Sequence, residues 1–245
     1  MQHRRQQNSE LIVALDFDNL NDALDFVGTA GDSVGWYKIG SQLFCSAGPA
    51  AVSELKKRGK KVFLDLKFHD IPNTVASAVA EAVKMGADMV NVHASGGRDM
   101  MKAAVKAADE KAKTGSRPLV IAVTVLTSMD AQALSEAMNR SDSYSPSEHV
   151  PHLAKLAKDS GMDGVVASAH EIELIRKACG EDFVLVIPGI RPADTSIDDQ
   201  KRIMTPAEAV RQGANFLVVG RPVLKAKVPA DAARAIKAEM DAAFR

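Results

Sequence analysis

Stretches typical of β-strands alternate with stretches typical of helices along the whole chain, and we count eight of each. The expected strands are residues 11–17, 34–40, 61–68, 87–94, 118–127, 164–169, 183–190 and 216–220. The expected helices are residues 20–30, 49–58, 72–85, 97–113, 146–160, 170–178, 206–212 and a last one reaching about 243, with a shorter helical piece at 131–138. Strands that alternate with helices pair in parallel through right-handed crossovers.

Eight such units in 245 residues predict an α/β fold of the (β/α)8 TIM-barrel type. We expect one domain over residues 1–245, with residues 1–9 as a flexible N-terminal extension. The alternative is an open, doubly wound sheet, which usually carries a glycine-rich turn after its first strand. The turn here, Leu15 to Asn19, contains no glycine, so the barrel is favoured.

Composition excludes some classes of partner. Lys plus Arg equals Asp plus Glu, at 31 each, so bulk charge gives no reason to expect nucleic acid or an acidic membrane. A small anionic ligand, which needs only a few local cations, stays possible. Cys45 and Cys179 are far apart and in no metal-ligand spacing, and the early apolar run 11–15 is too short for a signal peptide or membrane span. We therefore expect reduced cysteines and a cytoplasmic location.

The expected strand 61–68 carries charge where a buried strand should carry none. Side chains alternate along a strand, so Phe63, Asp65 and Lys67 share one face. A carboxylate at the end of an apolar strand needs a counter-charge, and Lys67 can supply it. Because carboxylates flank Lys67, its protonated form is favoured, which suits a proton donor rather than a nucleophile. The alternative is a structural ion pair, with Asp70 only capping the following helix.

Polar residues gather at the C-terminal ends of the expected strands, where barrels carry their reacting groups. They are Asp16, Lys38, Asp65, Lys67, Asn91, His93, Thr127, Ser128, Arg191 and Arg221. The N-terminal strand ends show no such collection. Taken alone, His93 is better explained as a hydrogen-bonded interior histidine than as a catalyst.

Glycine and arginine follow the seventh and eighth strands, where barrels commonly bind a phosphate. Gly189 and Gly220 would let backbone N–H groups approach a dianion, and Arg191 and Arg221 would supply forked donors. The loop from Arg191 to Met204 is long enough to form a lid over the site, although an ordinary surface loop is the alternative.

These residues resemble the orotidine 5'-phosphate decarboxylase family in its bacterial form, over nearly the whole chain. The most specific motifs are DLKFHDIPNT at 65–74, VNVHASGG at 90–97, VTVLTS at 123–128 and PGIRP at 188–192. The resemblance implies decarboxylation of orotidine 5'-monophosphate (OMP) to UMP, the last step of pyrimidine synthesis, with neither metal nor organic cofactor.

The resemblance also implies a role for each matching residue. Lys67 is similar to the general acid that protonates C6 of the pyrimidine, Asp65 to the carboxylate beside the substrate's own carboxylate, and Lys38 to its charged neighbour. A homodimer is implied, in which Asp70, Ile71 and Thr74 come from the other subunit. The remaining substrate contacts implied are Asp16 and Lys38 on the ribose, Thr127 on the pyrimidine edge, and Arg191, Gln200, Gly220 and Arg221 on the phosphate. Ser128 and Pro188 are also expected to bind the substrate.

Two alternatives stay open at this point. One is a metal-dependent sugar-phosphate decarboxylase or hexulose-phosphate synthase of the same barrel group, which shares the Asp-x-Lys-x-x-Asp pattern but uses magnesium. Lys38, aimed at the same rim as Asp65, would repel such a cation. The other is a non-catalytic nucleotide-binding barrel, which would need the phosphate-binding residues but not Lys67.

Overall fold

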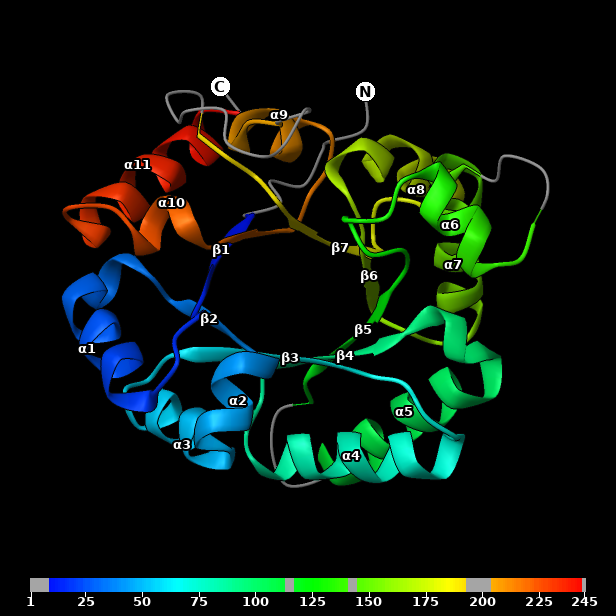
Figure 1. Ribbon diagram of the computed structural model, residues 1–245, viewed down its shortest axis with the longest axis horizontal. Coiled ribbons are helices and arrows are strands. Elements are labelled where there is room, and N and C mark those ends of the chain that lie inside the picture. The colour runs from blue at the N-terminus through cyan, green and yellow to red at the C-terminus, as the bar shows by residue number, and fades with distance from the viewer. Residues whose placement is uncertain (1–8, 113–116, 141–144, 193–203, 244–245) are drawn as a thin grey trace.

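A computed structural model describes residues 9–112, 117–140, 145–192 and 204–243. Its eight parallel strands form a closed barrel in chain order, with β8 pairing back onto β1, and this confirms the predicted TIM barrel (Figure 1). The strands are β1 (Glu10–Ala14), β2 (Trp36–Gly40), β3 (Lys61–Phe68), β4 (Met89–His93), β5 (Leu119–Val123), β6 (Gly164–Val166), β7 (Val184–Pro188) and β8 (Phe216–Val219).

Helices surround the barrel on its outside (Figure 1). They are α1 (Leu20–Ala30), α2 (Ser41–Ala47), α3 (Pro49–Lys57), α4 (Pro72–Lys84), α5 (Gly97–Lys111), α6 (Ala131–Ala137), α7 (Pro146–Asp159), α8 (Ile172–Cys179), α9 (Pro206–Arg211), α10 (Arg221–Leu224) and α11 (Pro229–Ala242), with 3-10 turns η1 (Gly31–Ser33), η2 (Ala94–Gly96) and η4 (Ala169–Glu171). In the described part of the chain no helix is both long enough and apolar enough to span a bilayer.

The strands alternate between two apolar layers. Side chains such as Val62 and Leu64 of β3 point outward and pack under the helices, whereas Phe63 points into the barrel with a small inner cluster. That inner cluster is Ile12, Ala14, Trp36, Phe63, Met89, Ile121, Val186 and Val218. Because Phe63 faces inward, Asp65, two residues later, also faces the interior.

The structure corrects some predicted boundaries. β5 ends at Val123, not at 127, because the Thr124 N–H and Oγ1 both donate to Val166 O, at 3.2 and 2.9 Å, before the chain turns away. Two short helices, α2 and α10, were not predicted. Each has fewer than eight residues and follows a strand end directly, which leaves little periodicity to detect.

The expectation that the N-terminal strand ends lack polar residues is wrong. Asp163, directly before β6, accepts the Val120 N–H of β5 at 2.7 Å and Arg117 Nη1 at 2.6 Å through Oδ2. Its own N–H donates to Val120 O at 3.0 Å, so the two residues are bonded twice.

Side chains directly before β4 and β8 bond the start of the neighbouring strand in the same way. Asp88 Oδ2 accepts Val62 N–H and Lys56 Nζ, and Asn215 Oδ1 accepts Leu185 N–H and Arg176 Nη2. We call Asp88, Asp163 and Asn215 the basal collar. At the matching position before β2 the chain has Gly35, which has no side chain to accept. The polar groups at this end therefore serve to join strand starts.

Candidate active site

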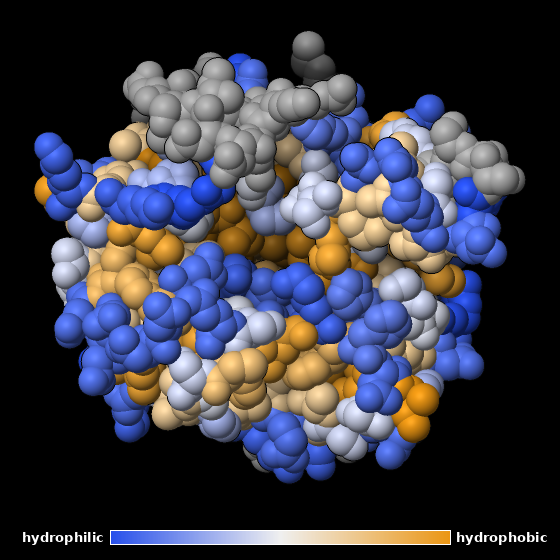
Figure 2. Space-filling model, in the orientation of Figure 1, coloured by the Kyte–Doolittle hydropathy of each residue, from blue (hydrophilic) through white to orange (hydrophobic). Residues whose placement is uncertain are grey.

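Four of the predicted residues form one ionic network at the C-terminal ends of β1, β2 and β3. Lys67 Nζ lies 2.6 Å from Asp65 Oδ1, and Lys38 Nζ lies 3.2 Å from Asp65 Oδ2. Lys38 also lies 3.6 Å from Asp16 Oδ1, which extends the network to β1. In Figure 2, hydrophilic residues border the central hollow on the side of β2 and β3, with apolar residues across from them.

Asp65 is the centre of this network, with only 10% of its side chain exposed. Burial by itself raises the pKa of a carboxyl. The neighbouring charges of Lys38 and Lys67, with hydrogen bonds from Lys67 and Asn91, outweigh burial and hold the pKa of Asp65 below its usual range. Asp65 is therefore ionised at neutral pH, and each of its oxygens faces an ammonium group.

Local backbone geometry sets the position of Lys67. The β3–β4 ladder is interrupted between Leu64 and Phe68, and within this bulge Lys67 has φ 49°. That left-handed conformation is uncommon for a residue with a side chain. The side chain of Lys67 is 36% exposed, so the ammonium lies at the edge of the solvent while its partner Asp65 lies deeper.

Two further residues support this geometry: Asn91, which the sequence analysis placed among the polar strand-end residues without giving it a role, and Gly40, which it did not single out. Asn91 of β4 is fully buried and donates from Nδ2 to Asp65 Oδ1 at 2.7 Å. Gly40, the last residue of β2, leaves room for Lys38, because a Cβ there would lie 2.9 Å from Lys38 Nζ. The sequence already indicates a special role for Asn91, because it places an amide between two valines in an apolar strand. Nothing in the sequence indicates the role of Gly40, since the space around a glycine depends on the folded chain.

The ends of β7 and β8 hold the residues predicted to bind phosphate. A Cβ on Gly220 would lie 3.5 Å from Asp16 Oδ2, so the end of β8 adjoins the ionic network. Gly189 has φ 78°, a conformation that favours glycine, directly after β7. Arg191 is buried, and its N–H donates to Met204 O at 3.4 Å, which joins the two ends of the loop. Arg221 begins α10, and Gln200 lies outside the described residues.

Asp70, Ile71 and Thr74 lie on the surface at the start of α4. Asp70 Oδ1 accepts the N–H of Ile71 at 2.6 Å, and 66% of Ile71 is exposed. In the described part of the chain Asp70 has no ion pair with Lys67 of the same chain. These three residues are thus separate from the ionic network of their own subunit.

The other predicted substrate contacts, Thr127, Ser128 and Pro188, are only partly brought together. Pro188 ends β7 and pairs with Val218 of β8 at the barrel wall. Thr127 and Ser128 lie in an exposed turn beyond β5 rather than at its end, and nothing in the described residues joins them to Asp65 or Lys67.

His93 ends β4 close to Lys67. Its ring centroid lies 5.3 Å from that of His69, with the planes tilted by 34°. Burial, His69 and Lys67 lower its pKa, against a smaller opposing effect of Asp65. His93 is therefore neutral at pH 7 and adds no charge beside Lys67.

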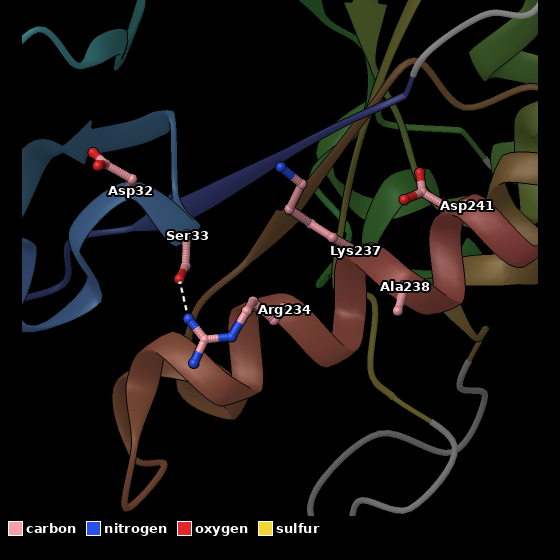
Figure 3. A pocket seen from close by; sticks show the side chains of 6 residues that line it. All are labelled: Asp32, Ser33, Arg234, Lys237, Ala238 and Asp241. Atoms are coloured by element: carbon pink, nitrogen blue, oxygen red, sulfur yellow. Dashed lines mark hydrogen bonds between the residues drawn. The ribbon is translucent and has the colours of Figure 1, made fainter.

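A second hollow of about 570 Å³ lies elsewhere, between η1 and α11 (Figure 3). Arg234 Nη1 donates to Ser33 Oγ across it at 2.7 Å, and Asp32, Lys237 and Asp241 complete its charged lining. Asp32 and Ser33 precede β2, so this groove is at the N-terminal end of the barrel and contains none of the predicted site residues.

Comparison with known proteins decides the family. The family model described as "Orotidine 5'-phosphate decarboxylase / HUMPS family" matches residues 9–236. The chain belongs to this family. A curated relative named orotidine 5'-phosphate decarboxylase, from Geotalea uraniireducens, is 51% identical over 233 residues, covering 95% of each chain. A second of the same name, from Moorella thermoacetica, is 49% identical and covers 97% of this chain and 94% of its own.

A solved structure agrees with the sequence relatives. The crystal structure of orotidine 5'-phosphate decarboxylase from Lactobacillus acidophilus superposes with a TM-score of 0.85 at 38% identity, covering 95% of this chain and 99% of its own. In this family member the ionic network of Asp16, Lys38, Asp65 and Lys67 occupies the end of the barrel where TIM barrels carry their reacting groups.

Proposed function

We propose that this chain is an orotidine 5'-phosphate decarboxylase, a carboxy-lyase that converts OMP to UMP. The observation that carries the proposal is the carboxylate of Asp65 held between the ammonium groups of Lys38 and Lys67, at 3.2 and 2.6 Å. It is supported by family membership and by relatives of about half identity that bear this name.

The chemistry needs a fixed cation at one carbon. Loss of carbon dioxide from C6 leaves a carbanion whose charge the pyrimidine ring cannot easily delocalise, so preorganised positive groups must stabilise it. Lys67, oriented by Asp65, provides an ammonium and then a proton for C6. Each proton delivered to C6 is replaced from solvent, to which Lys67 is partly exposed.

Distant parts of the substrate would supply the binding energy. We assign the phosphate to Arg191, Arg221, Gly220 and Gln200, the ribose to Asp16 and Lys38, and the pyrimidine to Thr127, Ser128 and Pro188. Binding at groups that do not react holds the ring against the network and so lowers the barrier at C6.

Two chains would share each site. Ile71 exposes a large apolar side chain at the start of α4, and Asp70 and Thr74 beside it are also exposed. We propose that these residues dock on a second copy and that Asp70 completes the partner's site. We also propose that the barrel is a single catalytic domain, and that the chain works in the cytoplasm, in keeping with its free Cys45 and Cys179.

Mixed dimers test the shared site. A dimer of Asp70→Ala and Lys67→Ala chains keeps one site with an intact Lys67 and an Asp70 from the partner. Activity should therefore reappear on mixing two inactive variants. Absence of recovery in dimers shown to be mixed would refute the shared site.

The metal-dependent alternative fits this site poorly. A divalent cation needs oxygen ligands, and both oxygens of Asp65 face ammonium groups. The discriminating experiment follows the ultraviolet absorbance of OMP with purified protein and a chelator. We expect full turnover under these conditions. Turnover that the chelator abolishes and added magnesium restores would favour the sugar-phosphate alternative.

A further inference from the structure

Asn91 is the one fully buried amide that touches the ionic network in the described part of the chain. It lies in β4 two residues after Met89, whose side chain belongs to the inner cluster, so it faces the barrel interior. Its neighbours Val90 and Val92 pack outward under the helices. An amide buried this deeply costs free energy unless its donor and acceptor are both satisfied.

Both ends of the Asn91 amide are used, and by different parts of the site. Nδ2 donates to Asp65 Oδ1 at 2.7 Å, and Oδ1 accepts the backbone N–H of Lys67 at 2.8 Å. Because the amide is planar and rigid, one side chain fixes the carboxylate of Asp65 relative to the backbone that carries Lys67.

The bond from the Lys67 N–H to Asn91 is needed because the hydrogen-bond ladder between β3 and β4 is interrupted at this point. Regular β3–β4 pairing stops at Leu64 and resumes at Phe68, so the N–H of Lys67 finds a side chain instead of a strand carbonyl. With φ 49°, Lys67 holds a left-handed conformation that is unfavourable for a residue with a side chain unless its surroundings stabilise it. The bond to Asn91 offsets part of that cost.

The side-chain bond also orders the carboxylate. Asp65 Oδ1 accepts from Asn91 and from Lys67 Nζ, while Oδ2 faces Lys38. The bond from Asn91 favours the orientation of the carboxylate in which each ammonium faces one of its oxygens. The position of Lys67 Nζ is thus set from both sides, through its own backbone and through Asp65.

We propose that Asn91 is a positioning residue, which holds Lys67 where it can protonate the substrate carbon without touching the substrate itself. This inference rests on the proposed function, in which Lys67 is the proton donor. It adds a requirement on β4 to an ionic network otherwise built from β1, β2 and β3.

The first test is Asn91→Leu, which keeps the number and branching of the side-chain heavy atoms and removes both bonds. Misplacing a reacting group by about 1 Å costs on the order of 100-fold in rate, so kcat should fall by roughly 10- to 100-fold. KM should change little, because the proposed phosphate and ribose contacts are on other strands. Loss confined to KM, or kcat per folded molecule equal to that of the unaltered protein, would overturn the proposal.

The second variant, Asn91→Asp, gives a readout that a structural role would not produce. A protonated Asp at this position can still donate to Asp65, whereas an ionised one places a second carboxylate beside it, and adjacent carboxylates resist ionising together. The new side chain would contact Asp65 and the backbone of Lys67 on β3, and the nearby charged or titratable groups are Lys38 on β2, which pairs with Asp65, and His93, two residues further along β4. Activity should therefore fall with rising pH relative to the unaltered protein, and parallel pH profiles would contradict the inference.

A matched control separates positioning from stability. Asn215→Ala, in the basal collar, also removes a side-chain oxygen that accepts a backbone N–H, but at the opposite end of the barrel. It should lower stability and leave kcat of the folded enzyme unchanged.

If the unaltered protein fails to decarboxylate OMP, the proposed function falls. If it succeeds and both Asn91 variants keep its kcat and pH profile, only this inference falls. Should Asn91→Leu not fold, Asn91→Asp decides.

Discussion

Replacing Asp163 tests how the basal collar stabilises the barrel. Asp163→Ala removes the acceptor of the Val120 N–H, whose residue is fully buried, and an unpaired buried N–H costs about 1–3 kcal/mol. It also breaks the ion pair between Asp163 and Arg117. Their side chains are 24% and 30% exposed, so the loss of this pair costs at most about 1 kcal/mol. The free energy of unfolding should therefore fall by about 1–4 kcal/mol, most of it from the unpaired N–H.

Asp163→Asn separates the two contributions. The amide oxygen can still accept the Val120 N–H, and only the charge is lost, so this variant should lose no more than about 1 kcal/mol. Both are measured by urea unfolding at one fixed protomer concentration, because association would otherwise shift the midpoint. If the Asn variant loses as much as the Ala variant, the bond to the backbone is not what stabilises the strand starts.

Three further predictions concern residues that are not members of the ionic network. Gly35→Asn should complete the collar, because Gly35 lies opposite Leu11 in the β1–β2 register and a Cβ there meets nothing within 4 Å. The free energy of unfolding should rise by about 1 kcal/mol, the usual contribution of one hydrogen bond. A lower free energy in urea unfolding would contradict this. Tyr37→Phe should raise the melting temperature, because among the described residues its buried hydroxyl has no hydrogen-bond partner, and a lowered melting temperature would count against that. His93 has a folded pKa below 6.5, so the unfolded chain binds more protons just below that pH and stability falls as pH drops. His93→Gln should reduce the dependence of the free energy of unfolding on pH, by at most about 1.4 kcal/mol per pH unit. Urea unfolding at several values between about pH 5 and 7 measures this, and an unchanged dependence would exclude His93 as its source.

The fold was predictable because its signals are local and repeated. Strand β3 and helix α1 have the predicted boundaries, since β-branched and apolar runs end there at turn residues or helix caps. β5 was predicted too long because Val125 and Leu126 continue an apolar run after the chain has left the sheet. The basal collar was missed because its aspartates precede strands and look like ordinary turn formers until their partners are known.

The site was predictable to the extent that strand ends converge in a barrel. Lys38, Asp65 and Lys67 lie on β2 and β3 and Asp16 follows the end of β1, so the order of the strands brings them together. The bulge at Lys67 and the two bonds of Asn91 were not predictable, because they depend on where the β3–β4 register breaks. No single-chain pattern reports such a break.

The most direct test of the account is the fate of OMP with the Lys67→Ala variant in metal-free buffer. The unaltered protein should convert OMP to UMP, followed by absorbance. The variant should still bind UMP in a calorimetric titration, since the proposed phosphate-binding residues are intact, but should lose turnover by several orders of magnitude. Turnover by Lys67→Ala at the rate of the unaltered protein would contradict the assignment of Lys67 as the proton donor.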